Sequence, residues 1–429
     1  MTNSDQSALS TKPEVEKKSG GGRILELDAI RALTCMNLLL FHYTYVYQYK
    51  YDGFSGDLGF AFPYGKYGVQ LFFMLSGLVN ALTLIKKRKP GQFITSRCIR
   101  ILPSYWLVIL LNLFLFSTLA MFNHSIAVGE TVANLTTMPG LFGFENMEPV
   151  TWTLQVEMLF YLFLMATFAM GWLDKPLRTL MVVIGICLAT CTFFDWYLET
   201  YPDSTWNSTF HVLNELFILR NLPLFSMGIL LNELRCGRGK PWQLWLGIGL
   251  SGVVFHLIDL REHNPVATVL MMGLLTAAAY GKIPILRLRP LVFISLISYP
   301  LYLFHNNLGT ALMKFAESVG VPAIPTLVLA TLVSIGLAAL ITYRFEQPLT
   351  NRLRKLFEKR RKAGNEDKVM AATQTATAAP TIASQTKTTD PQPGNAFDSS
   401  ECLDEVIEAE ELMREIRKDN PDEDALTKS

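Results

Sequence analysis

Charged residues are scarce in this chain of 429 residues, and the scarcity excludes whole classes of protein. Only 17% of the residues are charged, whereas 50% are hydrophobic and the mean hydropathy is +0.27. An ordinary soluble protein is about one-quarter charged. Too few charges remain here to cover the surfaces of several soluble domains. The composition therefore excludes a soluble enzyme, a nucleic-acid-binding protein and a disordered scaffold.

Cysteine pairs and a secretion signal are also missing where an exported protein would need them. The six cysteines lie in apolar segments, basic loops or the tail, and they are Cys35, Cys98, Cys187, Cys191, Cys236 and Cys402. None lies in a loop that is expected outside, so no extracellular disulfide framework is implied. The polar first 22 residues lack the apolar core and the cleavage site of a signal peptide. The first apolar segment is therefore expected to remain as a membrane helix.

Apolar segments of membrane-spanning length fill the chain between Leu27 and Tyr343. Each is roughly 17 to 22 residues long, which is the length that a helix needs to cross about 30 Å of hydrocarbon. We predict about ten spans, near residues 27–47, 66–85, 101–121, 151–171, 178–197, 214–233, 242–258, 265–281, 291–312 and 325–345. The predicted fold class is an all-α polytopic membrane protein.

Basic residues gather in alternate loops, and this pattern predicts the orientation in the membrane. The loops rich in Lys and Arg are 86–100, 174–178, 235–240, 281–290 and 344–362. By the positive-inside rule these loops and both termini are cytoplasmic. The opposite loops contain three N-x-[ST] sequons, at Asn123, Asn134 and Asn207, which would be open to glycosylation in a eukaryotic host.

Three regions follow from these patterns. They are a disordered cytoplasmic N-terminus (1–23), a transmembrane domain (24–350) and a cytoplasmic tail (351–429). The tail is expected to be mostly disordered because it is rich in Thr, Ala, Gln and Pro. Its residues 401–418 predict a short acidic amphipathic helix. That helix is either a docking site for a protein partner or a frayed, solvated segment.

The first predicted span carries ionisable residues at a spacing that places them on one helix face. Arg31 and His42 are eleven residues apart, so about 20° of rotation and about 16 Å along the axis separate them. Asp28 is placed to pair with Arg31. Ionisable groups inside a membrane are costly and mark functional sites. The alternative is that Arg31 reaches the inner headgroups and His42 lies at the outer interface among tyrosines.

Seven short segments occur in an order that matches a known family. They are LDAIRALT with the R-x10-H pair Arg31 and His42, GVQLFFMLSGLV (68–79), RCIRILPSYW (97–106), TWTLQVEMLFYLF (151–163), RNLPLFSMGILL (220–231), ISYPLYLFHNNL (297–308) and RFEQPLTNRL (344–353). Together they resemble the acyltransferase-3 family of integral-membrane acyltransferases, over about residues 24–350. Three positions depart from its pattern: Leu78 replaces a usual Phe, and Asn306 and Asn307 replace a usual Trp-Pro. They bear on the acceptor rather than on the reaction type.

The resemblance implies an O-acyltransferase, with O-acetylation the expected reaction, and gives roles to the matching residues. The expected catalytic residues are His42, Glu157 and His305, and the expected acyl-CoA-binding residues are Arg31, Arg97 and Arg100. Acyl-CoA, with acetyl-CoA expected, is a co-substrate, and neither a bound cofactor nor a metal site is expected. The predicted topology puts the three arginines toward the inner side and the three catalytic candidates toward the outer side. Guanidinium groups suit the phosphates of acyl-CoA, and imidazole suits proton transfer near neutral pH.

Several alternatives stay open at this level. His42 either takes the proton of the acceptor hydroxyl or carries the acyl group itself. Glu157 either orients His42 or pairs with Arg220. The expected acceptor is a carbohydrate or glycoconjugate on the outer side of the cell membrane, with a eukaryotic endomembrane as the second location. Rival functions are a proton-coupled exporter and an inactive scaffold that acts through the tail.

Overall fold

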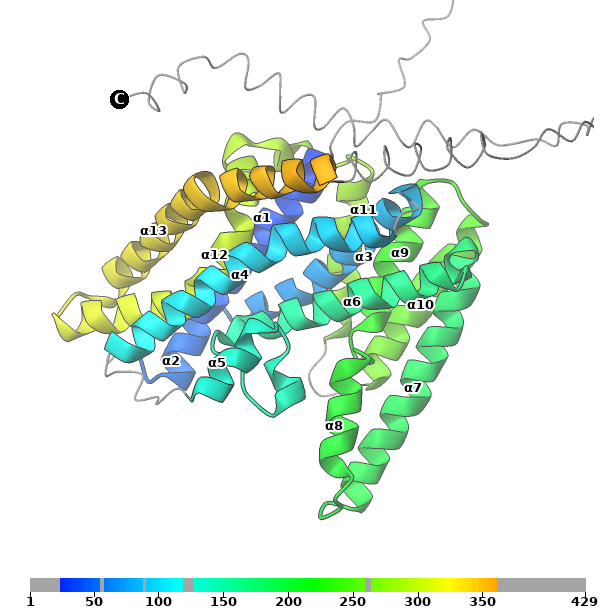
Figure 1. Ribbon diagram of the computed structural model, residues 1–429, viewed down its shortest axis with the longest axis horizontal. Coiled ribbons are helices and arrows are strands. Elements are labelled where there is room, and N and C mark those ends of the chain that lie inside the picture. Colours follow the sequence, from blue (N-terminus) through cyan, green and yellow to red (C-terminus); the bar gives the residue numbers. More distant parts are fainter. Residues whose placement is uncertain (1–23, 55–57, 88–89, 119–126, 259–263, 361–429) are drawn as a thin grey trace, which may run out of the picture. The chain divides into compact units, whose positions relative to one another are not determined.

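The computed structural model describes residues 24–54, 58–87, 90–118, 127–258 and 264–360 (Figure 1). The chain divides into two compact units, Leu25–Ala383 and a second one made of Met1–Ile24 with Ser384–Ser429, and only the first is described below. The helix predicted near 401–418 and the sequon at Asn123 lie outside the described residues.

Helices make up the described part of the chain, in which no strand occurs. In chain order the α-helices are α1 (Leu25–Leu40), α2 (Tyr47–Lys50), α3 (Gly68–Lys87), α4 (Pro90–Thr118), α5 (Val128–Leu135), α6 (Trp152–Ala169), α7 (Pro176–Thr200), α8 (Asn207–Leu216), α9 (Leu222–Arg235), α10 (Pro241–Ile258), α11 (Pro265–Ala279), α12 (Arg289–Ser318) and α13 (Ala323–Ile341). Two π-helical segments, η1 (Phe41–Val46) and η8 (Thr342–Glu346), directly continue α1 and α13.

Six described helices are long and apolar enough to cross a membrane. They are Pro90–Thr118, Pro149–Ala169, Pro176–Thr200, Pro241–Ile258, Arg289–Ser318 and Ala323–Arg360. The other four predicted spans fall on α1, α3, α9 and α11. The prediction of an all-α polytopic membrane protein is thereby confirmed.

Two predicted boundaries are wrong, and both errors involve proline or backbone conformation. The predicted cytoplasmic loop 86–100 is helical from Pro90 onward, because proline is well suited to the first position of a helix. Arg97 therefore lies inside α4 rather than in a loop. The predicted span 214–233 is interrupted after α8, where Ile218 has a φ of 47°, a left-handed conformation that cannot continue a helix.

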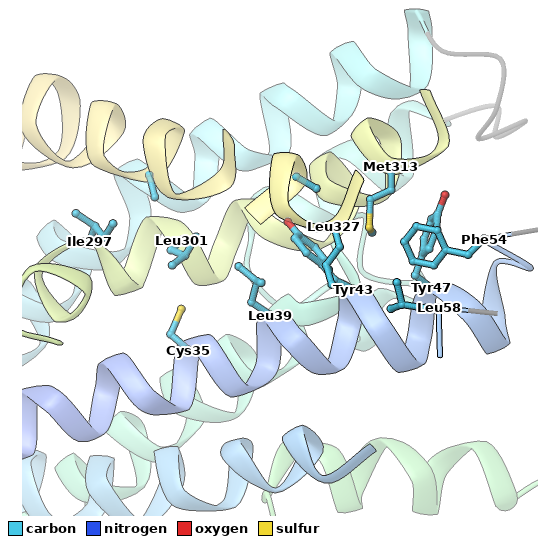
Figure 2. Packing of buried hydrophobic residues seen from close by; sticks show 12 residues of the cluster. Cys35, Leu39, Tyr43, Tyr47, Phe54, Leu58, Ile297, Leu301, Met313 and Leu327 are labelled. Atoms are coloured by element: carbon cyan, nitrogen blue, oxygen red, sulfur yellow. The ribbon is translucent and has the colours of Figure 1, made fainter. Parts of the chain in front are cut away.

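The core on one side of the protein lies between α1, α12 and α13. Figure 2 shows Cys35 and Leu39 of the first span pointing toward Leu301, and Tyr43 beside Leu327. The hydroxyl of Tyr43 donates to the carbonyl oxygen of His305 at 2.8 Å. It also lies 2.7 Å from the Oγ atom of Ser334 on α13. One buried phenol thus joins the three helices at the depth of His305.

A second close contact joins α3 and α9, and two glycines make it possible. A Cβ atom built on Gly228 would lie 1.9 Å from the carbonyl oxygen of Met74, and one on Gly77 would lie 2.2 Å from that of Phe225. Small residues allow membrane helices to approach closely in this way. The crossing fixes the position of α3, which lines the candidate site.

Residues 127–151, which precede α6, are folded, and Asn134 holds them. This side chain is 0% exposed. Its Nδ2 atom donates to the carbonyl oxygens of Glu130 and Glu145, and its Oδ1 atom accepts from the backbone N–H of Met147, each at 3.0 Å. Glycosylation at Asn134 is therefore incompatible with the fold, because a glycan on Nδ2 would replace one of two N–H groups that both donate, and the fully buried side chain leaves no room for a sugar.

Candidate active site

A cavity between α1, α3, α4, α6 and α12 brings together the three arginines that the sequence singled out. Arg31 comes from α1, whereas Arg97 and Arg100 come from α4. The polar residues that complete the lining include Thr34, Ser76, Asn80, Glu157, Tyr161 and Tyr299. We call this space the arginine cavity. Three guanidinium groups around one carboxylate make it a site for an anion.

Arg97 is held in the arginine cavity by aromatic rings. Its guanidinium carbon lies 5.3 Å from the ring centre of Phe93 and 5.7 Å from that of Tyr161. These distances are typical of cation–π contacts. The buried Nε atom of Arg97 has no hydrogen-bond partner among the described residues. The rings therefore fix the plane of the guanidinium group while an N–H group stays available to a ligand.

Arg31 and Glu157 are each held by neighbours on the same helix. The Nη1 atom of Arg31 donates to Asp28 at 3.0 Å, as the spacing on α1 predicted. The Oε1 atom of Glu157 accepts a hydrogen bond from the hydroxyl of Tyr161, one turn later on α6. The same atom accepts from the hydroxyl of Ser76, on α3, at 3.1 Å.

The position of Glu157 differs from the expectation that it lies beside His42. Glu157 lines the arginine cavity, and its hydrogen bonds go to Ser76 and Tyr161. The same cavity also holds Arg97, which lies inside α4 because that helix begins at Pro90. The pairing of Glu157 with Arg220 is not formed either, because Arg220 binds Asp195 at 2.5 Å.

His42 lies in a second pocket, which we call the histidine pocket. Its walls carry aromatic, amide and basic side chains, among them Phe41, Lys66, Tyr67, Gln70, Trp152 and Tyr302. His42 belongs to the π-helix η1, which follows α1 and whose backbone hydrogen bonds join residues five apart instead of four. Such π-helical turns are rare and are frequently found at functional sites. The sequence pattern did not predict this turn.

His305 lies next to His42, although the two residues belong to different helices. Their ring centres are 5.1 Å apart, with the rings edge-on. The Nδ1 atom of His305 lies 2.8 Å from the carbonyl oxygen of Tyr302, so it carries the proton and Nε2 is left as an acceptor. Neither Nε2 of His305 nor Nδ1 of His42 has a hydrogen-bond partner among the described residues, and both atoms are buried. The histidine pair therefore presents free nitrogen atoms to the pocket.

The arginine cavity and the histidine pocket meet at a shared wall. Leu38, Val69 and Tyr302 line both spaces. The hydroxyl of Tyr302 donates to the carbonyl oxygen of Val150 at 2.7 Å, which fixes its ring in this wall. A molecule anchored at the arginines thus needs to pass only this layer of side chains to reach His42.

A buried amide cluster behind His42 was missed by the sequence analysis. The Nδ2 atom of Asn307 donates to the Oδ1 atom of Asn112 at 2.7 Å, and the Nδ2 atom of Asn112 donates to Glu148 at 3.2 Å. The Nδ2 atom of Asn306 donates to Asn307 at 3.2 Å. Burial raises the pKa of the Glu148 carboxyl to about 8. Glu148 lies in a loop that was expected to face solvent, so a search for charges inside spans passes over it.

The arrangement suits transfer of a group from an anionic carrier to an acceptor beside a histidine. The arginines bind phosphate oxygens, and a neutral imidazole accepts a proton. Within the described ranges no group of three or more His, Cys, Asp or Glu side chains is placed to hold a metal ion.

Comparisons with known proteins agree with this chemistry. The sequence model of a family described as an acyltransferase domain matches residues 24–343. The exopolysaccharide production protein ExoZ of Rhizobium meliloti (strain 1021) is 30% identical over 314 residues, which cover 68% of this chain and 92% of that protein. No solved structure matches the chain.

Proposed function

The chain belongs to the acyltransferase family whose domain it matches, and on that premise we propose that it moves an acetyl group from acetyl-CoA to a hydroxyl of an extracellular polysaccharide or related glycoconjugate. The protein is thus a multi-pass membrane acyltransferase. The donor, the acyl group, the acceptor and the cell membrane as its location are our proposals.

One observation carries the proposal: the arginine cavity and the histidine pocket share a wall of three side chains. The inner arginines would hold the phosphates of acetyl-CoA, because planar guanidinium groups bind phosphate in a bidentate way. The pantetheine arm would then carry the thioester along the path from Arg31 to His42, which is about 16 Å for an eleven-residue separation on a helix. Donor and acceptor would meet at Leu38 and Tyr302.

In the proposed reaction the acceptor hydroxyl gives up its proton and gains the acetyl group, while CoA gives up the acetyl group and gains the proton. His42 takes the proton of the acceptor hydroxyl while the hydroxyl oxygen attacks the thioester carbonyl. The new C–O bond forms, the C–S bond breaks, and CoA leaves as a thiolate that takes the proton from His42. The Nε2 atom of His305, which accepts hydrogen bonds, would bind a neighbouring hydroxyl of the sugar, because the attacking hydroxyl gives its only proton to His42. In this proposal the catalytic role of Glu157 is indirect: it acts through its contacts with Tyr161 and with the arginines that line the same cavity. A route through acyl-His42 has the same overall balance.

The acceptor proposal is supported by the lining of the histidine pocket and by the relative. Aromatic side chains such as Tyr67 and Trp152, with a few convergent polar groups, are typical of a site that binds a small polar ring. The printed name of the relative refers to exopolysaccharide production. Both favour a sugar hydroxyl over a small soluble acceptor.

The experiment compares acetyl groups on polysaccharide from cells with and without the gene, by NMR of the purified polymer. We expect the acetyl signal to disappear without the gene and to return with the wild-type chain. His42→Ala and Arg31→Ala variants should restore less than about 1% of it, because general acid–base catalysis alone contributes about 100-fold to 10,000-fold. His211→Ala and the exposed Arg178→Ala serve as matched controls and should restore it fully. Full acetylation by folded, membrane-inserted His42→Ala would contradict the proposal.

A further inference from the structure

Glu148 is a buried acid that the proposed reaction does not yet use. It lies in the loop before α6 and is 1% exposed. One carboxylate oxygen, Oε2, accepts from Asn112, and the other, Oε1, is buried without a well-formed hydrogen bond among the described residues. A buried carboxylate that is only half satisfied is costly, so it calls for a functional explanation.

Asn306 lies between this acid and His42. It directly follows His305, whose ring centre lies 5.1 Å from that of His42, and its side chain is within electrostatic reach of both His42 and Glu148. Its amide also donates to Asn307 at 3.2 Å. An amide has one accepting and one donating end, so this placement orients Asn306 with its oxygen toward the histidine. An N–H group on His42 is then favoured on the side that faces Asn306.

The remaining amides hold this bridge in place. Asn307 donates to Asn112 at 2.7 Å and to the carbonyl oxygen of Met147 at 2.8 Å. Since Met147 directly precedes Glu148, the same amide fixes the backbone of the loop. The loop, α4 and α12 therefore converge on Glu148, and this chain has Asn306 and Asn307 where the family pattern has Trp-Pro.

We propose that Glu148 is a positioning residue for His42: acting through Asn306, its carboxylate orients the imidazole and stabilises the positive charge that His42 gains when it takes the proton of the acceptor. This inference rests on the proposed function. It adds a role for the loop before α6, and it makes the ionised form of Glu148 the active one.

The other titratable groups around His42 do not supply a negative charge. They are His305 and Tyr302 on α12, Lys50 on α2, and Lys66 and Tyr67 in the turn before α3. The titratable groups that face Glu148 itself are the phenols of Tyr43, Tyr51 and Tyr302. The two lysines oppose a charge on His42, whereas an ionised Glu148 favours it. Because burial raises the pKa of Glu148 to about 8, the rate should increase as the pH rises through about 8.

The test measures acetyl transfer as a function of pH. The full chain in nanodiscs is supplied with radiolabelled acetyl-CoA and with polysaccharide purified from cells that lack the gene. The wild-type rate should rise with a midpoint near pH 8. Glu148→Gln should lack this rise and be about 10-fold to 100-fold slower at pH 9, the range seen when outer partners of functional histidines are removed. At pH 6 the two rates should converge, and the KM for acetyl-CoA should stay within about 3-fold.

Three further variants separate positioning from stability. Glu148→Asp keeps a carboxylate and should recover the rise with pH, whereas Asn306→Leu should lose it. Glu317→Gln is the matched control, because Glu317 is a half-buried carboxylate on α12 that accepts from Tyr47 at 2.6 Å and does not contact His42. It should keep the wild-type profile. If Glu148→Gln does not fold, Asn306→Leu alone decides.

The outcomes distinguish this inference from the proposed function. If the wild-type chain labels the polysaccharide and folded Glu148→Gln matches its rate at every pH, the role of Glu148 is refuted and the proposed function stands. If the wild-type chain labels no polysaccharide at any pH, the proposed function itself is refuted.

Discussion

The crossing of α3 and α9 allows a quantitative prediction, because a single Cβ atom added at Gly228 would collide with backbone atoms of the other helix. In a Gly228→Ala variant the new Cβ atom would lie 1.9 Å from the carbonyl oxygen of Met74 and 2.7 Å from the amide nitrogen of Leu78. Ordinary van der Waals contact begins at 3.4 Å, so the shortfall at the oxygen is about 1.5 Å. A backbone carbonyl cannot rotate away as a side chain does, so α3 and α9 must separate.

Separation of these helices disrupts aromatic packing as well. Phe225 of α9 stacks on Phe160 of α6 with ring centres 3.8 Å apart, and its ring centre lies 4.9 Å from that of Phe73 on α3. Overpacking of this kind costs about 1–3 kcal/mol, against about 1 kcal/mol that Ala gains over Gly in a helix. Since the clash is with backbone, we expect the upper end, a net loss of about 2 kcal/mol. The midpoint of thermal unfolding should fall by roughly 4–8 °C.

The assay is thermal unfolding of the detergent-solubilised protein, followed by loss of the monodisperse peak in size-exclusion chromatography. Gly249→Ala on α10 is the matched control, because a Cβ atom there meets nothing within 4 Å. It should raise the unfolding temperature slightly, since only the helix propensity changes. An unfolding temperature of Gly228→Ala equal to that of Gly249→Ala would refute the close approach of α3 and α9.

Two more predictions concern charge. Arg97→Lys keeps the positive charge but loses the contacts of the guanidinium group with the rings of Phe93 and Tyr161, so the KM for acetyl-CoA should rise about 10-fold, equivalent to about 1.4 kcal/mol, with kcat within about 3-fold. The control Arg178→Lys should leave the KM unchanged. An unchanged KM in Arg97→Lys would speak against phosphate binding by Arg97. The pKa of Glu148 is raised from 4.5 to about 8 in the folded chain, so between these pH values the folded state keeps a proton that the unfolded state releases. The free energy of unfolding should therefore fall by a few kcal/mol as the pH rises from 4.5 to about 8. Glu148→Gln should remove that part of the pH dependence of chemical unfolding, and a wild-type slope in this variant would contradict the assigned pKa.

The parts of the site that follow from regular helix geometry could be predicted from the sequence. The spacing of Arg31 and His42 puts both residues in the first span, where Arg31 lines the arginine cavity and His42, in η1, lines the adjoining histidine pocket. The pairing of Arg31 with Asp28 follows from the same periodicity. The fold class followed from hydropathy, because the bilayer imposes a length on every span.

The remaining parts of the site depend on contacts between distant segments. Asn112 and Asn307 are 195 residues apart in the chain, and no local pattern predicts their hydrogen bond. The basic segment 86–100 was expected to be a loop, whereas Pro90 starts a helix there, and Arg97 of that helix contacts Tyr161, one turn after Glu157 on α6. The break at Ile218 follows from a backbone conformation that its β-branched side chain disfavours, so the residue type gave no warning.

The shared wall of Leu38, Val69 and Tyr302 has an electrical consequence for the proposed reaction. The membrane potential does work of about 2.3 kcal/mol per elementary charge per 100 mV on any charge that crosses. In the proposed reaction the charged phosphates of acetyl-CoA stay at the arginines, the acetyl group passes the wall toward the acceptor, and the acceptor's proton returns on the neutral thiol of CoA, so no net charge crosses. Transfer to an acceptor outside would then be neither driven nor opposed by the potential. The reaction rate in vesicles should accordingly be the same whether the membrane is polarised or not.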